Sequence, residues 1–279
     1  ITVVKEGISD KLQQGTQNQT PFTLKQNIEL RKLSFAFPDG HTLFSNLTLS
    51  ISCGERIGVR GASGSGKSLL AHAIIDILPP NAIVDGKIFY QGEILTKSKI
   101  KKYRGEQIAF IPQSVNYLDP SMKVKDQVKI GLKHEKKMEK REIQEKIFEQ
   151  FELKKAEGEL YPYQLSGGML RRVLFATSIG KNTELIIADE PTPGIHQAVL
   201  DKVLKQLRDF ADSGISVILI THDIISAVKI ADRISVFKDG KTIETAPSTS
   251  FIEGGESLKD EYSKRLWNSL PQNNFLEDR

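Results

Sequence analysis

Hydrophobic and polar residues alternate along the first part of the chain and recur with a longer period further on. Residues 28–60 alternate in the manner of antiparallel strands, whereas residues 124–160 follow a helical period. One apolar stripe at four-residue intervals consists of Ile143, Ile147 and Phe151. Two short apolar runs are of buried-strand length: residues 185–188 and 216–220. The pattern predicts an α/β fold in which a parallel-sheet core carries an antiparallel β subdomain and a helical insertion.

The composition of the chain excludes several classes of protein and kinds of site. The chain has 279 residues, of which 39% are hydrophobic, so it can bury a substantial core. A formal net charge of +4 is too mild to indicate a nucleic-acid partner. The single cysteine, Cys53, excludes an internal disulfide framework and a four-cysteine metal site, and we expect a packed, unreactive thiol there. No apolar run approaches the roughly 20 residues that span a bilayer.

A strand, a glycine-rich loop and a helix follow one another between residues 56 and 75. The loop has the spacing Gly, four residues, Gly-Lys-Ser. Glycines let backbone amides approach a phosphate, the lysine reaches the β- and γ-phosphates, and the serine hydroxyl ligates Mg²⁺. The positive end of the following helix aims at the same place. The predicted nucleoside triphosphate ligands are Gly61, Ala62, Ser63, Gly64, Ser65, Gly66, Lys67, Ser68 and Leu69.

Polar side chains stand at the ends of both apolar runs. Asp189 and Glu190 close the first, and a carboxylate at the carboxyl end of a parallel strand lies near bound phosphates. We expect Asp189 to hold Mg²⁺, directly or through water, and Glu190 to polarise the attacking water. His222 follows the second run, where it could contact the γ-phosphate or order the water. An acidic turn and a solvated histidine are the simpler alternatives.

A second anion-binding helix end is predicted at residues 164–172, which read Gln-Leu-Ser-Gly-Gly-Met-Leu-Arg-Arg. Ser166 can cap the helix that begins at Gly167 and Gly168, which makes an anion site without a lysine. Two such ends suggest a sandwich, in which two copies hold ATP between the phosphate loop of one and the Ser-Gly-Gly of the other.

On these motifs the chain resembles the ATPase subunits of ABC transporters from about residue 28 to residue 271. The resemblance implies a P-loop NTPase fold with a RecA-like parallel-sheet core, an antiparallel β subdomain and an α-helical subdomain. It implies Walker A at residues 61–68, the Walker B aspartate at Asp189, the catalytic glutamate at Glu190 and the switch histidine at His222. The signature lies at residues 165–169.

Two further residues are assigned by the resemblance alone. Gln113 matches the Q-loop glutamine, a catalytic residue and Mg²⁺ ligand that would link the γ-phosphate to the membrane subunits. Phe37 falls where the family stacks an aromatic ring on adenine, with a core or hairpin aromatic as the alternative. The implied domains are a polar extension at 1–26, the ATPase at 27–246 with its helical subdomain at about 114–172, and a C-terminal tail at 247–279.

Finer features resemble the oligopeptide, dipeptide and nickel importer branch. They include Leu118-Asp119-Pro120, Met169 in the signature, and a tail at residues 262–271 with no cysteine-rich segment after it. The implied function is ATP hydrolysis that powers uptake of peptides or nickel and metal chelates. The implied cofactors are ATP and Mg²⁺. The implied partners are a second ATPase subunit, two permease subunits and, indirectly, an extracytoplasmic substrate-binding protein, with no nucleic acid. The implied location is peripheral, on the cytoplasmic face of the cell membrane.

One segment departs from the family pattern. Residues 193–196 read Pro-Gly-Ile-His where the family has Ser-Ala-Leu-Asp, so His196 replaces an aspartate that couples the two ATP sites. We hypothesise that the second ATPase subunit is a different chain, which makes a heterodimer with unequal sites; neutral drift is the alternative. Two other functions stay open: a soluble ABC ATPase outside transport, and an ATP-binding regulatory subunit with weak hydrolysis.

Overall fold

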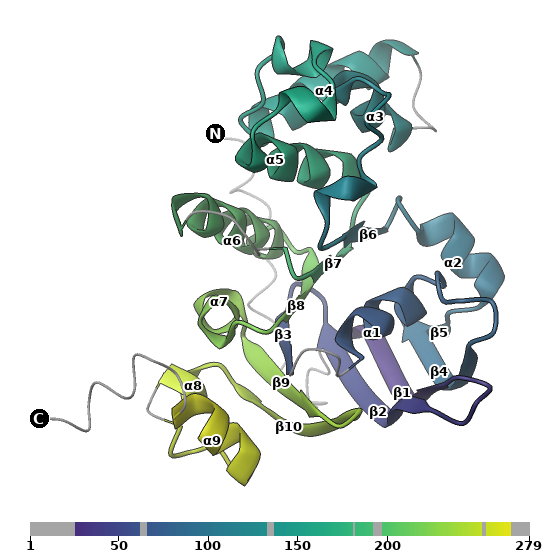
Figure 1. The fold of residues 1–279 in the computed structure, drawn as a ribbon, viewed down its shortest axis with the longest axis vertical. Helices are drawn as coiled ribbons and strands as arrows, with labels where there is room; N and C mark the ends of the chain where they lie inside the picture. Colours follow the sequence, from purple (N-terminus) through teal and green to yellow (C-terminus); the bar gives the residue numbers. More distant parts are fainter. Residues whose placement is uncertain are drawn as a thin grey trace, which may run out of the picture.

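Two sheets and the helices around them account for most of the chain (Figure 1). The computed structural model describes residues 26–61, 66–132, 137–180, 182–191, 197–252 and 255–268. The strands are β1 (Gln26–Ala36), β2 (Thr42–Ser52), β3 (Arg56–Gly61), β4 (Ile83–Tyr90), β5 (Glu93–Ile94), β6 (Ile108–Ile111), β7 (Leu185–Asp189), β8 (Ser216–Thr221), β9 (Arg233–Lys238) and β10 (Lys241–Pro247). The α-helices are α1 (Lys67–Ile74), α2 (Lys97–Tyr103), α3 (Val124–Ile130), α4 (Lys137–Gln150), α5 (Gly167–Ser178), α6 (Gln197–Asp212), α7 (Ile224–Ile230), α8 (Thr249–Ile252) and α9 (Glu261–Asn268).

The central sheet has the strand order β10-β9-β3-β8-β7-β6, in which only β10 runs antiparallel to its neighbour. Both apolar runs form interior strands of this sheet, and every residue of β7 and β8 is buried. In register, Asp189 lies beside Ile220 and Arg60 beside Thr221. The carboxyl ends of β3, β7 and β8 therefore meet at one edge of the sheet, which is where the candidate residues stand.

The second sheet, in the order β2-β1-β4-β5, is antiparallel throughout. The alternation predicted for residues 28–60 holds through β1 and β2, but residues 56–61 belong to β3 of the parallel sheet. Cys53 is exposed in the turn after β2, so the packed thiol expected there is wrong. The strand alternation that predicted its burial ends one residue earlier, at Ser52.

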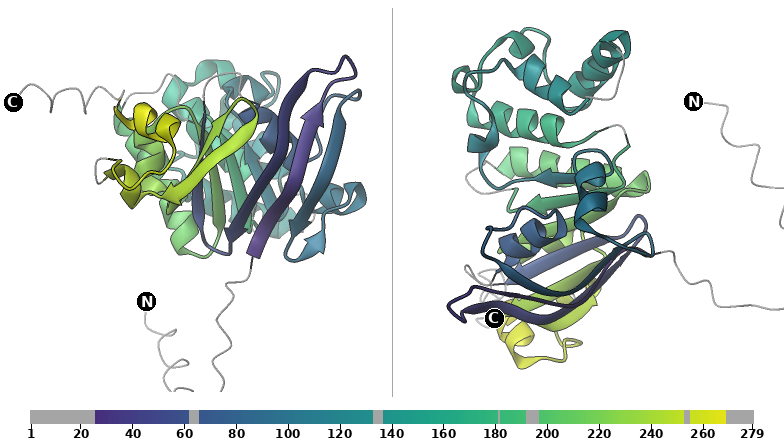
Figure 2. Two further views of the ribbon diagram at one scale, coloured as in Figure 1. Left: turned by 90° about the horizontal axis from the view of Figure 1, so that it is seen from below. Right: turned by 90° about the vertical axis from the view of Figure 1, so that its right-hand side faces the viewer.

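Helix α1 lies between the two sheets (Figure 2). Its buried residues Leu70 and Ile74 share one core with β1, β2 and the near face of the central sheet. The far face of the sheet is covered by α5 and α6, and by α7 next to the C-terminal elements. Because β7 is covered on both faces, its successive side chains enter different cores: Leu185 and Ile187 in one, Ile186 and Ala188 in the other.

A helical unit of α3, α4 and α5, with short 3₁₀ turns, stands at one end of the long axis (Figure 1). The predicted stripe packs inward: Ile147 and Phe151 are buried, and Ile143 is partly buried against them. The ring of Phe151 lies 6.3 Å from that of Phe175 in α5, measured between ring centroids. The helical period of the sequence therefore identified the core face of this unit.

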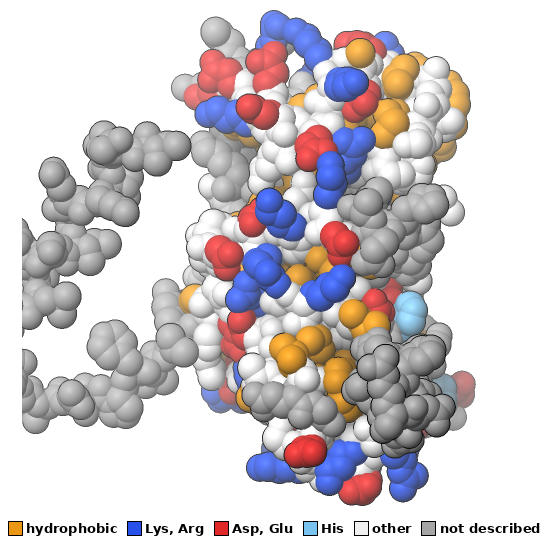
Figure 3. All heavy atoms as spheres, turned by 90° about the vertical axis from the view of Figure 1, so that its left-hand side faces the viewer, with side chains coloured by type: hydrophobic (Ala, Val, Ile, Leu, Met, Phe, Trp, Pro, Cys, Tyr) orange, Lys and Arg blue, Asp and Glu red, His pale blue; other side chains and the backbone are white. Residues whose placement is uncertain are grey.

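The C-terminal elements close the opposite end. Phe251 of α8 and Trp267 of α9 are buried against α7 and β9, with ring centroids 6.4 Å apart. On the face shown in Figure 3, basic and acidic side chains are interspersed. Within the described residues, no helix is both long and apolar enough to cross a membrane.

Candidate active site

Strand β3 and helix α1 flank the predicted phosphate loop. Gly61 closes β3 and Gly66 directly precedes α1. The residues between them lie outside the described part of the chain: Ala62, Ser63, Gly64 and Ser65. Gly66 has a φ of +86°, and a Cβ on it would lie 3.4 Å from a ring carbon of Phe44. A larger residue would be strained there, so the chain's own backbone requires this glycine.

Lys67 begins α1 and its side chain reaches back toward β3. The residue is only 6% exposed, and its ammonium group donates a hydrogen bond to the Gly61 carbonyl at 2.8 Å. Burial lowers the pKa of Lys67, and the neighbouring carboxylates of Glu190 and Asp189 oppose that shift. The lysine is therefore a buried cation between the end of β3 and the carboxylates that follow β7.

Asp189 and Ser68 form an oxygen pair suited to a hard cation. Asp189 is 3% exposed, and its Oδ1 has no hydrogen-bond partner among the described residues. Burial raises the pKa of Asp189, while a hydrogen bond from the Ser68 hydroxyl opposes the shift. A buried carboxylate oxygen left unpaired beside a serine hydroxyl fits Mg²⁺, which binds oxygen ligands and needs few from the protein.

Glu190 and His222 are joined directly. His222 Nδ1 lies 2.6 Å from Glu190 Oε2, and the two side chains are 61% and 9% exposed. The Glu190 backbone N–H donates to the Ile220 carbonyl at 2.8 Å, which ties the end of β7 to β8. Its φ of +45° is uncommon for a residue other than glycine, and such strain clusters at functional sites. The exposed His222 thus contacts the buried carboxylate of Glu190, a residue whose backbone is strained.

One open cavity of about 410 Å³ brings most of these residues together. Its described lining is Leu43, Gly66, Lys67, Ser68, Leu69, Gln113, Glu190 and His222. Gln113, the predicted Q-loop glutamine, therefore faces the same space as the lysine and the glutamate. Leu43 was not predicted, because nothing in the alternation of β2 distinguishes it from its neighbours.

Phe37 is the residue predicted to stack on adenine. It lies in the turn between β1 and β2, and its ring packs edge-to-face on Phe35 at 5.2 Å between centroids. The ring of His41 stacks on it at 6.4 Å. Phe37 is absent from the described lining of the cavity. The adenine-stacking role of Phe37 therefore stays a prediction.

The signature segment lies away from the cavity, at the start of α5. As predicted, Ser166 caps the helix: its Oγ accepts a hydrogen bond from the Met169 backbone N–H at 3.4 Å. Ser166 and Gly167 are exposed, and Gly168 is partly exposed. A Cβ on Gly167 would meet nothing within 4 Å among the described residues. None of these three residues is in the described lining of the cavity.

A buried arginine, which the sequence analysis missed, connects α5 to the Q-loop. Arg171 is 5% exposed and donates to the Gln113 carbonyl at 2.8 Å. Burial lowers its pKa. The available signal was its spacing, because it lies one helical turn before the buried residues Leu174 and Phe175. This hydrogen bond links the signature helix α5 directly to the backbone of Gln113 in the cavity wall.

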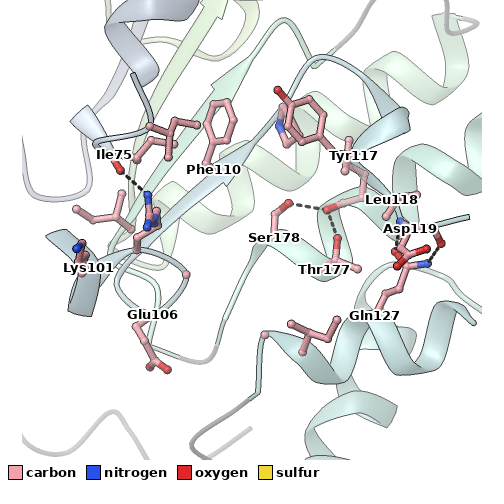
Figure 4. Close-up of a pocket in the computed structure, with 18 of the residues that line it drawn as sticks. Ile75, Lys101, Glu106, Phe110, Tyr117, Leu118, Asp119, Gln127, Thr177 and Ser178 are labelled. Carbon is pink, nitrogen blue, oxygen red and sulfur yellow. Dashed lines mark hydrogen bonds between the residues drawn. The ribbon is translucent and has the colours of Figure 1, made fainter. Parts of the chain in front are cut away.

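A larger groove of about 890 Å³ opens between α2 and the helical unit (Figure 4). Lys101 and Arg104 stand on the α2 side, while Gln127 of α3 and Thr177 of α5 stand on the helical side. Arg104 donates to the Ile75 carbonyl at 3.1 Å, which fixes that wall to the end of α1. Tyr117, four residues after Gln113, lines the groove and is 64% exposed.

Comparisons with known proteins agree with this geometry. Residues 44–193 match the family model described as ABC transporter. The chain is 36% identical over 230 residues to the metal-staphylopine import system ATP-binding protein CntD of Staphylococcus aureus, covering 79% of this chain and 85% of that protein. It is 33% identical over 229 residues to the oligopeptide transport ATP-binding protein OppD of Escherichia coli, covering 78% and 68%.

A solved structure extends the likeness to three dimensions. It is the dimeric post-hydrolysis state of the ATP-binding cassette MJ0796 bound to ADP and Pi. That structure superimposes with a TM-score of 0.71 at 26% identity, covering 79% of this chain and 98% of that chain. The expected P-loop fold, with a parallel core, an antiparallel sheet and a helical unit, is confirmed. The chain therefore belongs to the ABC transporter family, as an ATP-binding cassette that hydrolyses ATP.

Proposed function

We propose that this chain is an ATP-hydrolysing subunit of an importer that takes up peptides or nickel and other metal chelates through a separate permease. The observation that carries the proposal is the cavity in which Lys67, Gln113 and the Glu190–His222 pair face one space. The relatives named for oligopeptide and metal-staphylopine import support the choice of substrate class. The chain would act at the cytoplasmic face of the membrane, with a substrate-binding protein as an indirect partner on the other side.

Each residue of the cavity has a distinct role in this proposal. Lys67, with the phosphate loop, binds the β- and γ-phosphates. Ser68, Gln113 and Asp189 would hold Mg²⁺, which neutralises charge on the phosphate oxygens when it is bound. Glu190 takes the proton of the attacking water. His222 contacts the Glu190 carboxylate and keeps it oriented toward the γ-phosphate.

The exposed signature end completes the site of a second ATPase subunit. Ser166, Gly167 and Gly168 would meet the phosphates held by the partner's loop, and the open space at Gly167 leaves room for that approach. Residues 193–196, the segment that departs from the family pattern and includes His196, lie outside the described part of the chain. Because the sequence departs from the family pattern there, we propose that the second ATPase subunit is a different chain and that the complex is a heterodimer.

The groove of Figure 4 is the proposed seat of a permease segment. It offers exposed apolar surface at Tyr117 and Ile130, which are 64% and 47% exposed, and exposed lysines at 101 and 102. A short amphipathic segment with an acidic residue is complementary to this wall. Gln113, four residues before Tyr117, lines the cavity, so a movement of the permease segment can be transmitted to the γ-phosphate.

The proposed domain bounds are those expected from the sequence. The ATPase domain is residues 27–246, with a helical subdomain at about 114–172, and residues 247–279 form its tail.

Replacing Glu190 tests the catalytic half of the proposal. Glu190→Gln keeps the size and one hydrogen bond of the side chain but removes the base, so steady-state turnover should fall by about 10²–10⁴-fold with ATP affinity retained. Glu256→Gln, at an exposed position, is the matched control and should turn over normally. Near-normal turnover of the Glu190 variant would remove that residue from its role.

Purification from gently solubilised membranes tests the transport half. Mass spectrometry should find two permease subunits and a second ATPase subunit with the chain. Tyr117→Glu should lose the permease while retaining ATP binding, whereas Tyr163→Glu, an exposed tyrosine outside the described groove lining, should keep it. Recovery from the soluble fraction alone would favour the non-transport ATPase, and ATP binding without turnover in the intact complex would favour the regulatory subunit.

A further inference from the structure

Arg171, in the second turn of the signature helix α5, is a buried cation. Its Nη1 donates to the Gln113 carbonyl at 2.8 Å, and its Nε is buried without a hydrogen-bond partner in the described part of the chain. No carboxylate of a described residue forms an ion pair with it. A buried cation without a counter-charge costs free energy of folding, so its presence needs an explanation other than stability.

Gln113, the partner of this arginine, stands where the chain passes from the central sheet to the helical unit. Strand β6 ends two residues earlier at Ile111, which pairs in register with Ala188 of β7. After Gln113, Leu118 is buried in the same core as residues of α3, α4 and α5, and Val115 packs against that core. Gln113 therefore joins two parts of the fold.

The loop of residues 113–122 is held by the helical unit at both ends. At its far end, Gln127 of α3 accepts the Asp119 backbone N–H and donates to the carbonyls of Asp119 and Met122, each at 2.9 Å. At its near end the hydrogen bond comes from Arg171 of α5. Because α3 and α5 share one core, we expect the loop to move with these helices.

The Gln113 side chain belongs to the cavity that Lys67 and Glu190 also line. A change in the position of α5 moves the backbone of Gln113, and this movement changes where its side chain stands in the cavity. The same helix begins at Gly167, in the exposed signature end. A helical segment of about 6 Å therefore separates the signature end from Arg171, at 1.5 Å per residue.

We propose that Arg171 is a positioning residue that transmits movement of the signature helix to Gln113. Contact of the signature end with ATP on the second ATPase subunit then adjusts Gln113 in the ATP site of this chain. The two ATP sites are thereby linked by a route that does not pass through residues 193–196, where the sequence departs from the family pattern. The inference rests on the roles proposed above for Gln113 and for the signature end.

A double-mutant cycle on the full chain, in complex with its partner subunits, tests the inference. Arg171→Met keeps a long side chain and removes its donors, so kcat should fall by about 10-fold while KM for ATP changes less than about 2-fold. Gln113→Ala should lower kcat by about 10-fold or more. In the Gln113→Ala background, Arg171→Met should then have no further effect on kcat, because the arginine acts through the glutamine.

Gln144→Leu is the matched control. Gln144 is also buried in the helical unit, and its Nε2 donates to the Lys125 carbonyl at 2.7 Å. This bond joins α4 to α3 and does not involve Gln113, so the substitution should lower the melting temperature and leave kcat unchanged. Arg171→Lys keeps the charge and a donor, so it should recover part of the kcat lost in Arg171→Met. If Arg171→Met does not fold, Arg171→Lys supplies the cycle.

Trapping of ATP separates transmission from binding at the signature end. In the Glu190→Gln background, Arg171→Met should still form a two-subunit particle that holds ATP, because Ser166 and Gly167 are unchanged. Loss of that particle would overturn the inference, since the arginine would then act on the signature end itself. Unchanged kcat in Arg171→Met, or effects of the two substitutions that multiply, would also overturn it. Normal kcat in Gln113→Ala would overturn the role proposed for Gln113 together with the inference, which distinguishes that failure from the others.

Discussion

The two helices whose starts were predicted to bind phosphate, α1 and α5, are built differently. At α1, Gly66 is forced by a φ of +86° and by Phe44 beside it, and Lys67 is buried against Gly61. At α5, Ser166 caps the helix within its own turn, and no described residue lies within 4 Å of the position of a Cβ on Gly167. The first end is fixed by the chain that carries it, whereas the packing of the described residues gives no reason for the glycine at the second.

The difference indicates where each end finds its ligand. The start of α1 lies beside a buried lysine, an unpaired carboxylate oxygen and a glutamate with a positive φ, so one chain supplies all of these groups. The start of α5 is capped and exposed, and no described residue lies near Gly167, so we propose that its ligand is held by another subunit. We therefore expect substitutions at the start of α1 to weaken ATP binding within one subunit, and substitutions at the start of α5 to lower turnover only when a second ATPase subunit is present.

The largest effect is expected from Lys67→Met. It removes the buried cation that faces the phosphates, so turnover should fall by about 10²–10³-fold and ATP binding to the isolated chain should weaken strongly. Lys205→Met, on the exposed face of α6, is the control. Equilibrium binding of a fluorescent ATP analogue, with steady-state phosphate release, measures both quantities. Full ATP affinity in the Lys67 variant would place the nucleotide elsewhere.

The two glycines give the sharpest contrast. Gly167→Val should leave the melting temperature and the ATP affinity of the isolated chain unchanged, yet lower turnover of the assembled complex by about 10²-fold. Gly66→Ala should destabilise the isolated chain itself by about 1–2 kcal/mol, because alanine resists a positive φ. Calorimetry with turnover assays on both variants checks the pair. A destabilised Gly167 variant with normal turnover would reverse the comparison.

Asp189→Asn should separate stability from function. Burial raises the pKa of Asp189, so ionising it opposes folding. The contribution of protonated Asp189 to folding stability is present at acid pH and is lost as the pH rises through the folded-state pKa. The asparagine variant should therefore be more stable than the native chain at pH 7, by about 1 kcal/mol, and the difference should shrink toward acid pH.

Urea unfolding without nucleotide, from pH 7 downward, measures this difference. The same variant should lose the extra stability that Mg²⁺ and ATP give the native chain. A variant less stable than the native chain at pH 7 would contradict the burial cost assigned to Asp189.

The smallest effect is expected from Ser166→Ala. The capping hydrogen bond is long, at 3.4 Å, so its loss should cost about 0.5–1 kcal/mol, or about 1–3 °C in melting temperature. Ser166→Thr should restore the cap. Differential scanning calorimetry is precise enough to detect this change, and a fall of 10 °C or more would mean that Ser166 has another structural role.

Much of the site was predictable because its residues end strands or open helices. Asp189, Glu190 and His222 follow apolar runs, and the central sheet brings the ends of those runs together. Arg171 was not predicted, because its role depends on a contact with the Q-loop, a segment far away from it in the sequence. The exposure of Cys53 was missed for a local reason, since the strand ends one residue before it.

The most direct measurement is native mass spectrometry of the Glu190→Gln chain with the second ATPase subunit that co-purifies with it, in Mg²⁺ and ATP. We expect a two-subunit particle that traps ATP, and loss of that particle when Gly167→Val is added although each subunit still binds ATP. ATP trapped with the same lifetime on a single chain, whatever residue stands at position 167, would contradict it.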